Sequence, residues 1–335
     1  MTQHSHWKPS RRQVLITGGL ASSGLAVGAF LHASKLKTAL RSGIAFGTTV
    51  SLKACHADAA RLDRALDAAW GEISRVEQAA SLFRAESALS DLNRAGRLDA
   101  PPHILVQLLT EAMDIAKVTD GAFDPTIQPL WRVYADAFAA GRAATDDEIA
   151  TASALIGWRD IDVSPQRIQL TRPGMALTLN GIAQGFATGR CLAILKEHAI
   201  ENAFIDTGEI GVAGKRDDQT AWTAAIADPR QRGDFAGFAQ PLSGILATSG
   251  DYATVWSTDF SHHHILDPKT HHSPMETASV SVLAQSGSMA DGLATAMMVM
   301  GPEKSLALTR RLPGVEALII TKSGRQFKTD GFPFV

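Results

Sequence analysis

The sequence predicts an α+β fold in which antiparallel strand pairs pack against helices. Segments with the two-residue period of strands and segments with the helical period are mixed along the 335 residues, without the regular alternation of a parallel sheet. Hydrophobic residues make up 45% of the chain, which is enough for a sizeable core. No long linker divides residues 41–335, so one compact domain is expected there.

The first two elements of this domain have different periods. Residues 43–53 alternate between larger and smaller or polar side chains, which predicts a half-buried strand. Its larger residues are Ile44, Phe46, Thr48, Val50 and Leu52. A helix is expected next, because apolar residues then recur every three or four positions. They are Leu62, Leu66, Trp70, Ile73 and Val76.

The same periodicities predict six further elements. They are a helix with an apolar stripe over 104–116, a hairpin over 159–171, a helix from near Gly181, a strand over 203–206, a helix over 290–300 and a strand over 315–321. Two segments are expected at the surface. Residues 136–153 are rich in Ala, Asp and Thr and predict a helix or loop, and residues 228–240 predict a mobile loop.

The first 40 residues differ from the rest. Arg11 and Arg12 precede an uncharged, weakly hydrophobic run over 14–31. This pattern is typical of a twin-arginine export signal, so residues 1–40 are interpreted as the signal, residues 41–335 as the functional domain, and the periplasm as the location. Such a signal tethers a protein to the membrane transiently. An uncleaved N-terminal anchor is the alternative.

Charge and cysteine content narrow the function classes. The formal net charge is −2, so no basic excess predicts a nucleic-acid partner. The two cysteines, Cys55 and Cys191, are too few for a disulfide framework. Cys191 lies in an apolar helical pattern, which favours a buried free thiol.

A carboxylate and a hydroxyl share one face of the expected helix over 290–300. Asp291 and Thr295 are four residues apart, and Mg²⁺ can be held by one or two protein oxygens when a phosphate substrate completes its coordination. The structural alternative is that Asp291 caps the helix. Earlier in the chain, Gly181 opens a helix whose free amide groups would attract phosphate, a weak signal when taken alone.

Histidines concentrate between residues 262 and 272. Their spacing gives no regular zinc ligand set, because adjacent histidines on a strand cannot all face one metal. A single catalytic imidazole is the better interpretation, with His264 the first candidate for a general base and Asp251 the second. Each has a structural alternative, in which Asp251 stabilises its own turn and His264 holds the loop.

Seven short motifs in this order resemble the ApbE family of FAD:protein FMN transferases. They are Ser81-Leu82-Phe83 with residues 87–93, Gly121-Ala122-Phe123-Asp124-Pro125-Thr126, the turn over 181–186, Asp206-Thr207-Gly208, Thr248-Ser249-Gly250-Asp251-Tyr252, His264-Ile265-Leu266-Asp267-Pro268, and the segment over 290–296. The resemblance covers residues 43 to about 322. It implies a T-fold-related α+β flavin transferase fold with antiparallel sheets and packed helices.

The resemblance also implies a site. Asp291, Thr295 and the carbonyl of Ala183 would hold Mg²⁺. Phe83 matches an aromatic near the flavin ring, and Phe46 stands where the family often has Met. The remaining residues implied to bind FAD are Asp124, Thr126, Gly181, Gln184, Asp206, Gly208 and Ser249.

The implied reaction is phosphoryl transfer. A Thr or Ser hydroxyl of an acceptor flavoprotein attacks the FMN phosphorus of FAD, and AMP leaves. Two alternatives use the same site: hydrolysis of FAD to FMN and AMP, or non-catalytic periplasmic flavin binding in assembly. Retention of Asp291 and Thr295 argues against a pure binder.

Two positions depart from the family pattern. Thr178 replaces a carboxylate, and Gln184 replaces a lysine that would bring charge to the phosphates. The twin-arginine pattern together with residues 180–185 resembles the NosX branch, which implies that the acceptor is the membrane regulator of nitrous oxide reduction.

Overall fold

A computed structural model describes residues 36–231, 233 and 235–335. The predicted export signal falls almost entirely on residues 1–35, which lie outside this range. Strand β1 (Lys37–Ala45) begins inside the segment 1–40 assigned to that signal. Among the described residues, no helix is both long and apolar enough to cross a membrane.

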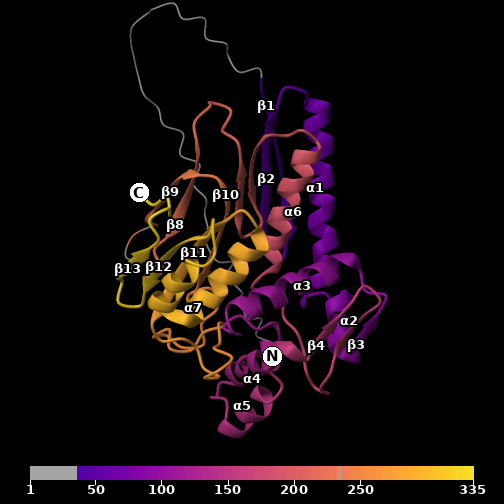
Figure 1. Cartoon of the computed structure of the whole chain (residues 1–335), viewed down its shortest axis with the longest axis vertical. Coiled ribbons are helices and arrows are strands. Elements are labelled where there is room, and N and C mark those ends of the chain that lie inside the picture. Colours follow the sequence, from indigo (N-terminus) through magenta and orange to yellow (C-terminus); the bar gives the residue numbers. More distant parts are fainter. Residues whose placement is uncertain (1–35, 232, 234) are drawn as a thin grey trace, which may run out of the picture.

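The main scaffold is an eight-stranded antiparallel sheet (Figure 1). Its strand order is β1-β2-β6-β7-β10-β11-β12-β13. The strands after β1 are β2 (Thr48–His56), β6 (Asn202–Asp206), β7 (Ile210–Ala213), β10 (Gly244–Gly250), β11 (Thr277–Ala284), β12 (Glu316–Thr321) and β13 (Gln326–Lys328).

Three long helices cover one face of this sheet: α1 (Ala59–Ala80), α6 (Ala183–Glu197) and α7 (Gly287–Thr309). Figure 1 shows α1 beside α6, and α7 lying across β11 and β12. The hairpin of β8 (Trp222–Ala227) and β9 (Phe235–Leu242) packs on the opposite face. In β12, Ile319 therefore packs with α7 while Leu318 packs with the hairpin, and both are buried.

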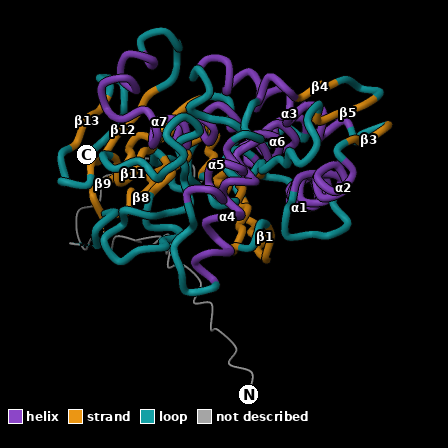
Figure 2. Tube along the Cα trace, turned by 90° about the horizontal axis from the view of Figure 1, so that it is seen from below, coloured by secondary structure: helices purple, strands orange, loops and turns teal. Residues whose placement is uncertain are grey.

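A second, smaller region completes the domain, and Figure 2 shows part of it from below. A three-stranded sheet has the order β3-β5-β4. The elements of this region are α2 (Ala88–Ala95), β3 (Arg97–Asp99), α3 (His103–Val118), η1 (Pro125–Ile127), α4 (Gln128–Ala139), α5 (Asp146–Ser153), η2 (Trp158–Asp160), β4 (Ile161–Val163) and β5 (Arg167–Leu170).

Most predicted elements are confirmed, and the α+β class with them. The helices α1, α3 and α6, the β4–β5 hairpin and the strands β6 and β12 lie where expected. Helix α7 is longer than predicted and includes a kink at Gly301, which precedes Pro302. Cys191 is a buried free thiol, as predicted.

Two predictions were wrong. The single strand over 43–53 is two strands, because Phe46 and Gly47 both adopt positive φ (51° and 72°) and form a tight hairpin turn between β1 and β2. The loop predicted over 228–240 is a strand from Phe235 onward, since β9 pairs with β8. Residues 232 and 234 of that segment lie outside the described residues.

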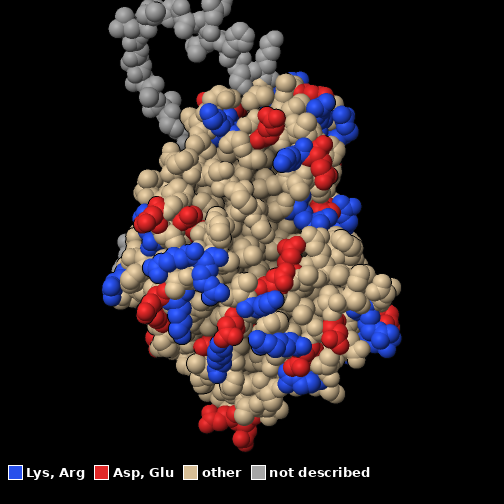
Figure 3. All heavy atoms as spheres, in the orientation of Figure 1, with Lys and Arg blue, Asp and Glu red and all other residues tan. Residues whose placement is uncertain are grey.

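Charged side chains are mixed on the surface. Figure 3 shows Lys and Arg interspersed with Asp and Glu on the face in view, without a large patch of one sign. This distribution accords with the small net charge of −2.

Candidate functional site

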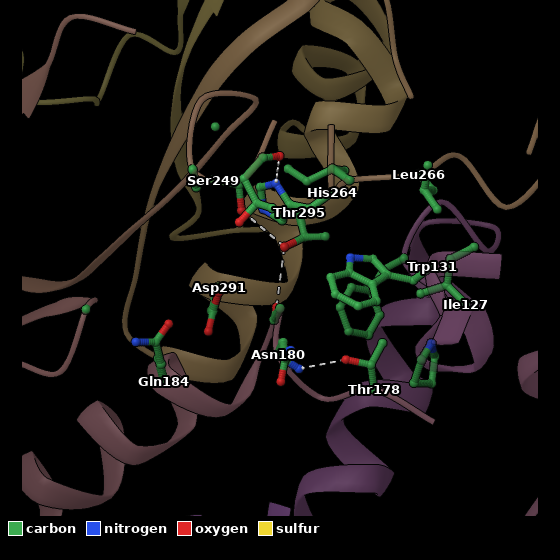
Figure 4. A pocket seen from close by; sticks show the side chains of 18 of the residues that line it. Ile127, Trp131, Thr178, Asn180, Gln184, Ser249, His264, Leu266, Asp291 and Thr295 are labelled. Atoms are coloured by element: carbon green, nitrogen blue, oxygen red, sulfur yellow. Dashed lines mark hydrogen bonds between the residues drawn. The ribbon is translucent and has the colours of Figure 1, made fainter. Parts of the chain in front are cut away.

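A cavity of about 400 Å³ lies where α6, α7 and the 251–268 loop meet the small region. Ten of the predicted site residues line it: Phe46, Phe83, Asp124, Gly181, Gln184, Gly208, Ser249, His264, Asp291 and Thr295. In Figure 4, Asp291 and Gln184 lie on one side of the cavity and Trp131, Ile127 and Leu266 on the other. The cavity therefore has a polar wall and an apolar wall.

The polar wall begins where α6 crosses α7. The two helices touch through Gly185 and Gly287, because a Cβ added at Gly287 would overlap the Gly185 carbonyl. This close approach lets the Gly185 amide donate to Asp291 Oδ2 at 2.9 Å. Asp291 is buried, with 4% of its surface exposed. Its carboxylate is thus fixed at the N-terminal end of α6, where unpaired amide groups favour negative charge.

Thr295 lies one turn after Asp291 on the same side of α7. Its Oγ1 is 3.1 Å from Ser249 Oγ and donates to the Gly181 carbonyl at 3.5 Å. Figure 4 shows Thr295 between Ser249 and the segment at Asn180. A carboxylate, two hydroxyls and a carbonyl therefore gather at this wall. Ala183 is the first residue of α6; it is buried and is not among the residues lining the cavity.

Gln184 connects α6 to the turn after β6. Its Nε2 donates to the Thr207 carbonyl at 2.8 Å. Gly208 has a φ of 101°, and a Cβ there would overlap the Gln184 amide. Asp206 accepts a hydrogen bond from the Gly208 amide at 2.9 Å and stabilises the turn, but it does not line the cavity.

Glu209 also lines the cavity and directly follows the Asp206-Thr207-Gly208 motif. It is buried, and its Oε2 accepts from the Thr248 amide at 2.8 Å. This bond ties the turn after β6 to β10.

Asp124 closes the cavity on the side of the small region. Its Oδ1 accepts from the amide and hydroxyl of Thr126, at 2.8 and 2.6 Å, and its Oδ2 accepts from the Trp158 amide at 3.1 Å. Burial raises the pKa of Asp124 above its ordinary value, against these hydrogen bonds, which lower it. Thr126 is fully buried and does not line the cavity.

Aromatic side chains from three different segments line the cavity. Phe46 lies at the tip of the β1–β2 hairpin, held by its amide, which donates to Glu77 Oε1 at 2.8 Å. Phe83 lies in the loop after α1 and is 78% exposed. Trp131 of α4 was missed by the sequence reasoning, although it follows the 121–126 motif closely. Its ring meets Trp256 edge-on at 5.9 Å.

The two candidate bases lie in different environments. His264 lines the cavity, and its Nδ1 lies 3.2 Å from the Thr254 carbonyl. A carbonyl can only accept, so Nδ1 carries the proton of the neutral ring and Nε2 carries the lone pair of a base. Asp251 does not line the cavity. It is fully buried and forms an ion pair with Arg230 at 2.7 Å, so the geometry favours His264.

The donors at the polar wall indicate the metal that they could hold. Among residues 36–231, 233 and 235–335, no group of three or more His, Cys, Asp or Glu forms a metal cluster. The oxygens of Asp291, Thr295 and Gly181 are hard ligands, which suit Mg²⁺ with phosphate and water completing its coordination.

A family model described as the ApbE family matches residues 46–319, which is most of the chain. The chain belongs to the ApbE family. Two relatives are named FAD:protein FMN transferase. The protein of Treponema pallidum is 33% identical over 290 residues, or 78% of each chain, and that of Vibrio cholerae is 30% identical over 86% of this chain and 88% of its own.

Solved structures of ApbE proteins share the fold. The flavin transferase ApbE of Vibrio cholerae superimposes with a TM-score of 0.75 at 28% identity, over 90% of this chain and all of its own. The ApbE protein of Thermotoga maritima gives a TM-score of 0.78 at 26% identity, over 88% of this chain and 97% of its own. The ApbE-like fold expected from the sequence is thereby confirmed.

Proposed function

We propose that this protein is an FAD:protein FMN transferase that uses Mg²⁺ and joins FMN to a Thr or Ser hydroxyl of a partner protein. The observation that carries this proposal is the placement of Asp291 and Thr295 beside the N-terminus of α6 in one cavity. The names of the relatives supply the reaction class. The cavity volume lies in the range of small-molecule sites.

The polar wall would receive the pyrophosphate of FAD. The N-terminus of α6 offers amide groups to the phosphates, and Asp291, Thr295 and the Gly181 carbonyl would hold the metal. Mg²⁺ bound there supplies charge withdrawal from the phosphate oxygens. The apolar wall of Ile127, Trp131 and Leu266 offers a surface to the planar rings. The aromatic side chains of Phe46 and Phe83 also line the cavity and offer such surfaces.

His264 would accept the proton of the acceptor hydroxyl at Nε2. The acceptor oxygen then forms a bond to the FMN phosphorus, the bond from that phosphorus to the bridging oxygen breaks, and AMP leaves with that oxygen. The Thr254 carbonyl holds the ring in the tautomer that this step needs. In this proposal the chain contributes positioning and charge neutralisation.

In-gel flavin fluorescence tests the proposal. A candidate acceptor is incubated with the protein, FAD and Mg²⁺, then denatured and separated, with Asp291→Ala as the control. A fluorescent acceptor band that is absent with the variant supports transfer. Release of AMP without a band would point to FAD hydrolysis, and intact bound FAD without a band would point to a binding protein.

We propose further that the protein acts in the periplasm after twin-arginine export, and that its acceptor is the membrane regulator of nitrous oxide reduction, as for the NosX branch. The support is the paired Arg11 and Arg12 before the weakly hydrophobic run over 14–31. Replacing both arginines by lysine should retain the protein in the cytoplasm in a cell fractionation. Unchanged export would contradict the assignment.

A further inference from the structure

Asp251 is a buried carboxylate held by two cations. It follows directly after β10 and is fully buried. Arg230, from the β8–β9 connection, binds it with both terminal nitrogens, at 2.8 and 2.7 Å. Lys322, directly after β12, lies 3.8 Å from Asp251 Oδ2. Both cationic side chains are only 16% exposed, so the group is largely shielded from water.

The same two cations also hold Phe260. The Arg230 guanidinium lies 4.3 Å from the centroid of the Phe260 ring. Lys322 Nζ donates to the Phe260 carbonyl at 2.7 Å. Phe260 has a φ of 60°, an unfavourable conformation for a bulky residue that needs outside contacts to persist. Arg230 and Lys322 therefore fix the start and the middle of the loop that begins at Asp251.

This loop returns to the cavity and carries His264. The Thr254 carbonyl accepts from both the amide and the Nδ1 of His264, at 3.0 and 3.2 Å. The Trp256 amide donates to the His262 carbonyl at 2.8 Å and joins the two halves of the loop. Ala253, Thr254 and His264 all line the cavity, whereas Arg230, Asp251 and Lys322 do not.

We infer that the Arg230–Asp251–Lys322 cluster is a positioning device that fixes Thr254 and thereby the imidazole of His264. The inference rests on the proposed function, in which His264 accepts the acceptor proton. Asp251, the second candidate base from the sequence, would then act indirectly, by holding the loop that positions His264. The bidentate Arg230–Asp251 pair fixes the orientation of the Asp251 carboxylate as well as its distance, which a single hydrogen bond does not.

The experiment compares Arg230→Ala with wild type in the full chain, using FAD, Mg²⁺ and an acceptor that wild type flavinylates. We expect kcat for transfer to fall about 10- to 100-fold, because small misplacements of reacting groups have effects of this size. The Kd for FAD, measured by flavin fluorescence, should change less than about threefold, because most of the residues that line the cavity lie outside the 251–268 loop. Added guanidinium should restore part of the lost kcat.

Arg142→Ala is the matched control. Arg142 also binds a carboxylate through two nitrogens, Glu148 at 2.8 and 2.6 Å, but this pair is at the surface and away from the cavity. Its kcat should equal that of wild type. Phe260→Leu is a second variant, which keeps the ion pair and removes only the ring under Arg230; it should lower kcat in the same direction, with FAD still bound.

Three outcomes would overturn the inference. Arg230→Ala with the kcat of wild type would show that the cluster does not position His264. The two variants could also fold but lose FAD binding and kcat in parallel. If, in addition, guanidinium did not restore the kcat of Arg230→Ala, the cluster would have only a general structural role. If wild type binds and cleaves FAD but flavinylates no acceptor, the proposed function fails first, and this result is distinct from the other two.

Discussion

The Gly185 amide donates to Asp291 Oδ2 across the crossing of α6 and α7, with a nitrogen–oxygen distance of 2.9 Å. The contact requires that both helices have glycine where they meet, at Gly185 and Gly287. The close approach of the two helix backbones thus places the Asp291 carboxylate beside the N-terminus of α6. A metal ion held there and a phosphate attracted by the helix would share the same space.

Asp291→Asn separates the charge of this residue from its hydrogen bond. The amide oxygen of Asn can still accept from Gly185, so the unfolding temperature should change little, while the loss of charge should weaken Mg²⁺ binding and lower FAD turnover at least about 100-fold. Calorimetric titration with Mg²⁺ and AMP release would measure the two effects. Full turnover in the variant would exclude Asp291 as a metal ligand.

Gly287→Ala tests the helix crossing. The added methyl group would overlap backbone atoms of Gly185, so the helices must separate, and the free energy of unfolding should fall by about 1–3 kcal/mol. Urea denaturation measures this loss. Gly71→Ala is the control, because Gly71 lies in α1 with no atom within 4 Å of an added Cβ; it should stabilise the protein by about 0.5–1 kcal/mol. Equal effects of the two substitutions would contradict the account.

Gln184→Lys tests the departure from the family pattern. Gln184 lines the cavity at the start of α6, and a lysine there would add positive charge beside the proposed phosphate position. The KM for FAD should fall about 3- to 10-fold at low ionic strength and less at high salt. Gln184→Met, which adds no charge, should not lower KM. A KM that is unchanged by lysine at every salt concentration would place the phosphates elsewhere.

His263 predicts an acid-sensitive fold. It is fully buried, and burial lowers its pKa from 6.5 to about 3. Because the native pKa is below the unfolded value, His263 contributes stability that is present above pH 6.5 and is lost as pH falls toward 3. The unfolded state binds the extra proton, so this group alone should lower the free energy of unfolding by about 1.4 kcal/mol per pH unit below 6.5.

Urea midpoints at pH 7, 6 and 5 should fall less steeply for His263→Leu than for wild type. Equal slopes would show that His263 does not titrate in this way.

Much of the fold could be predicted from local periodicity, and the elements that were missed have physical reasons. Strands β10 and β12 are buried on both faces, between the helices and the β8–β9 hairpin. Such strands lack the alternation that revealed β2, and β10 was missed. The turn at Phe46 and Gly47 was missed because the alternating pattern continues through both residues. A two-residue turn of this kind depends on the backbone dihedral angles of its residues, which the hydrophobic pattern does not reveal.

The site was predictable where a motif faces the cavity directly. Asp291 and Thr295 share a helix face, so their spacing fixes their direction. Asp251 lies in a turn, Thr126 in the short η1 helix and Asp206 at the end of β6, where local periodicity does not fix the direction of a side chain, and none of the three lines the cavity. Arg230 could not be linked to Asp251 from the sequence, because only the folded sheet brings their loops together.

We propose that the cavity at the α6–α7 crossing transfers FMN to a protein hydroxyl. Mass spectrometry of the acceptor after reaction with FAD and Mg²⁺ tests it most directly. We expect one Thr or Ser peptide to be heavier by FMN less one water, with an equal amount of AMP released, and neither product with Asp291→Asn. Equal transfer by wild type and this variant, or FAD consumed with the acceptor unmodified, would contradict it.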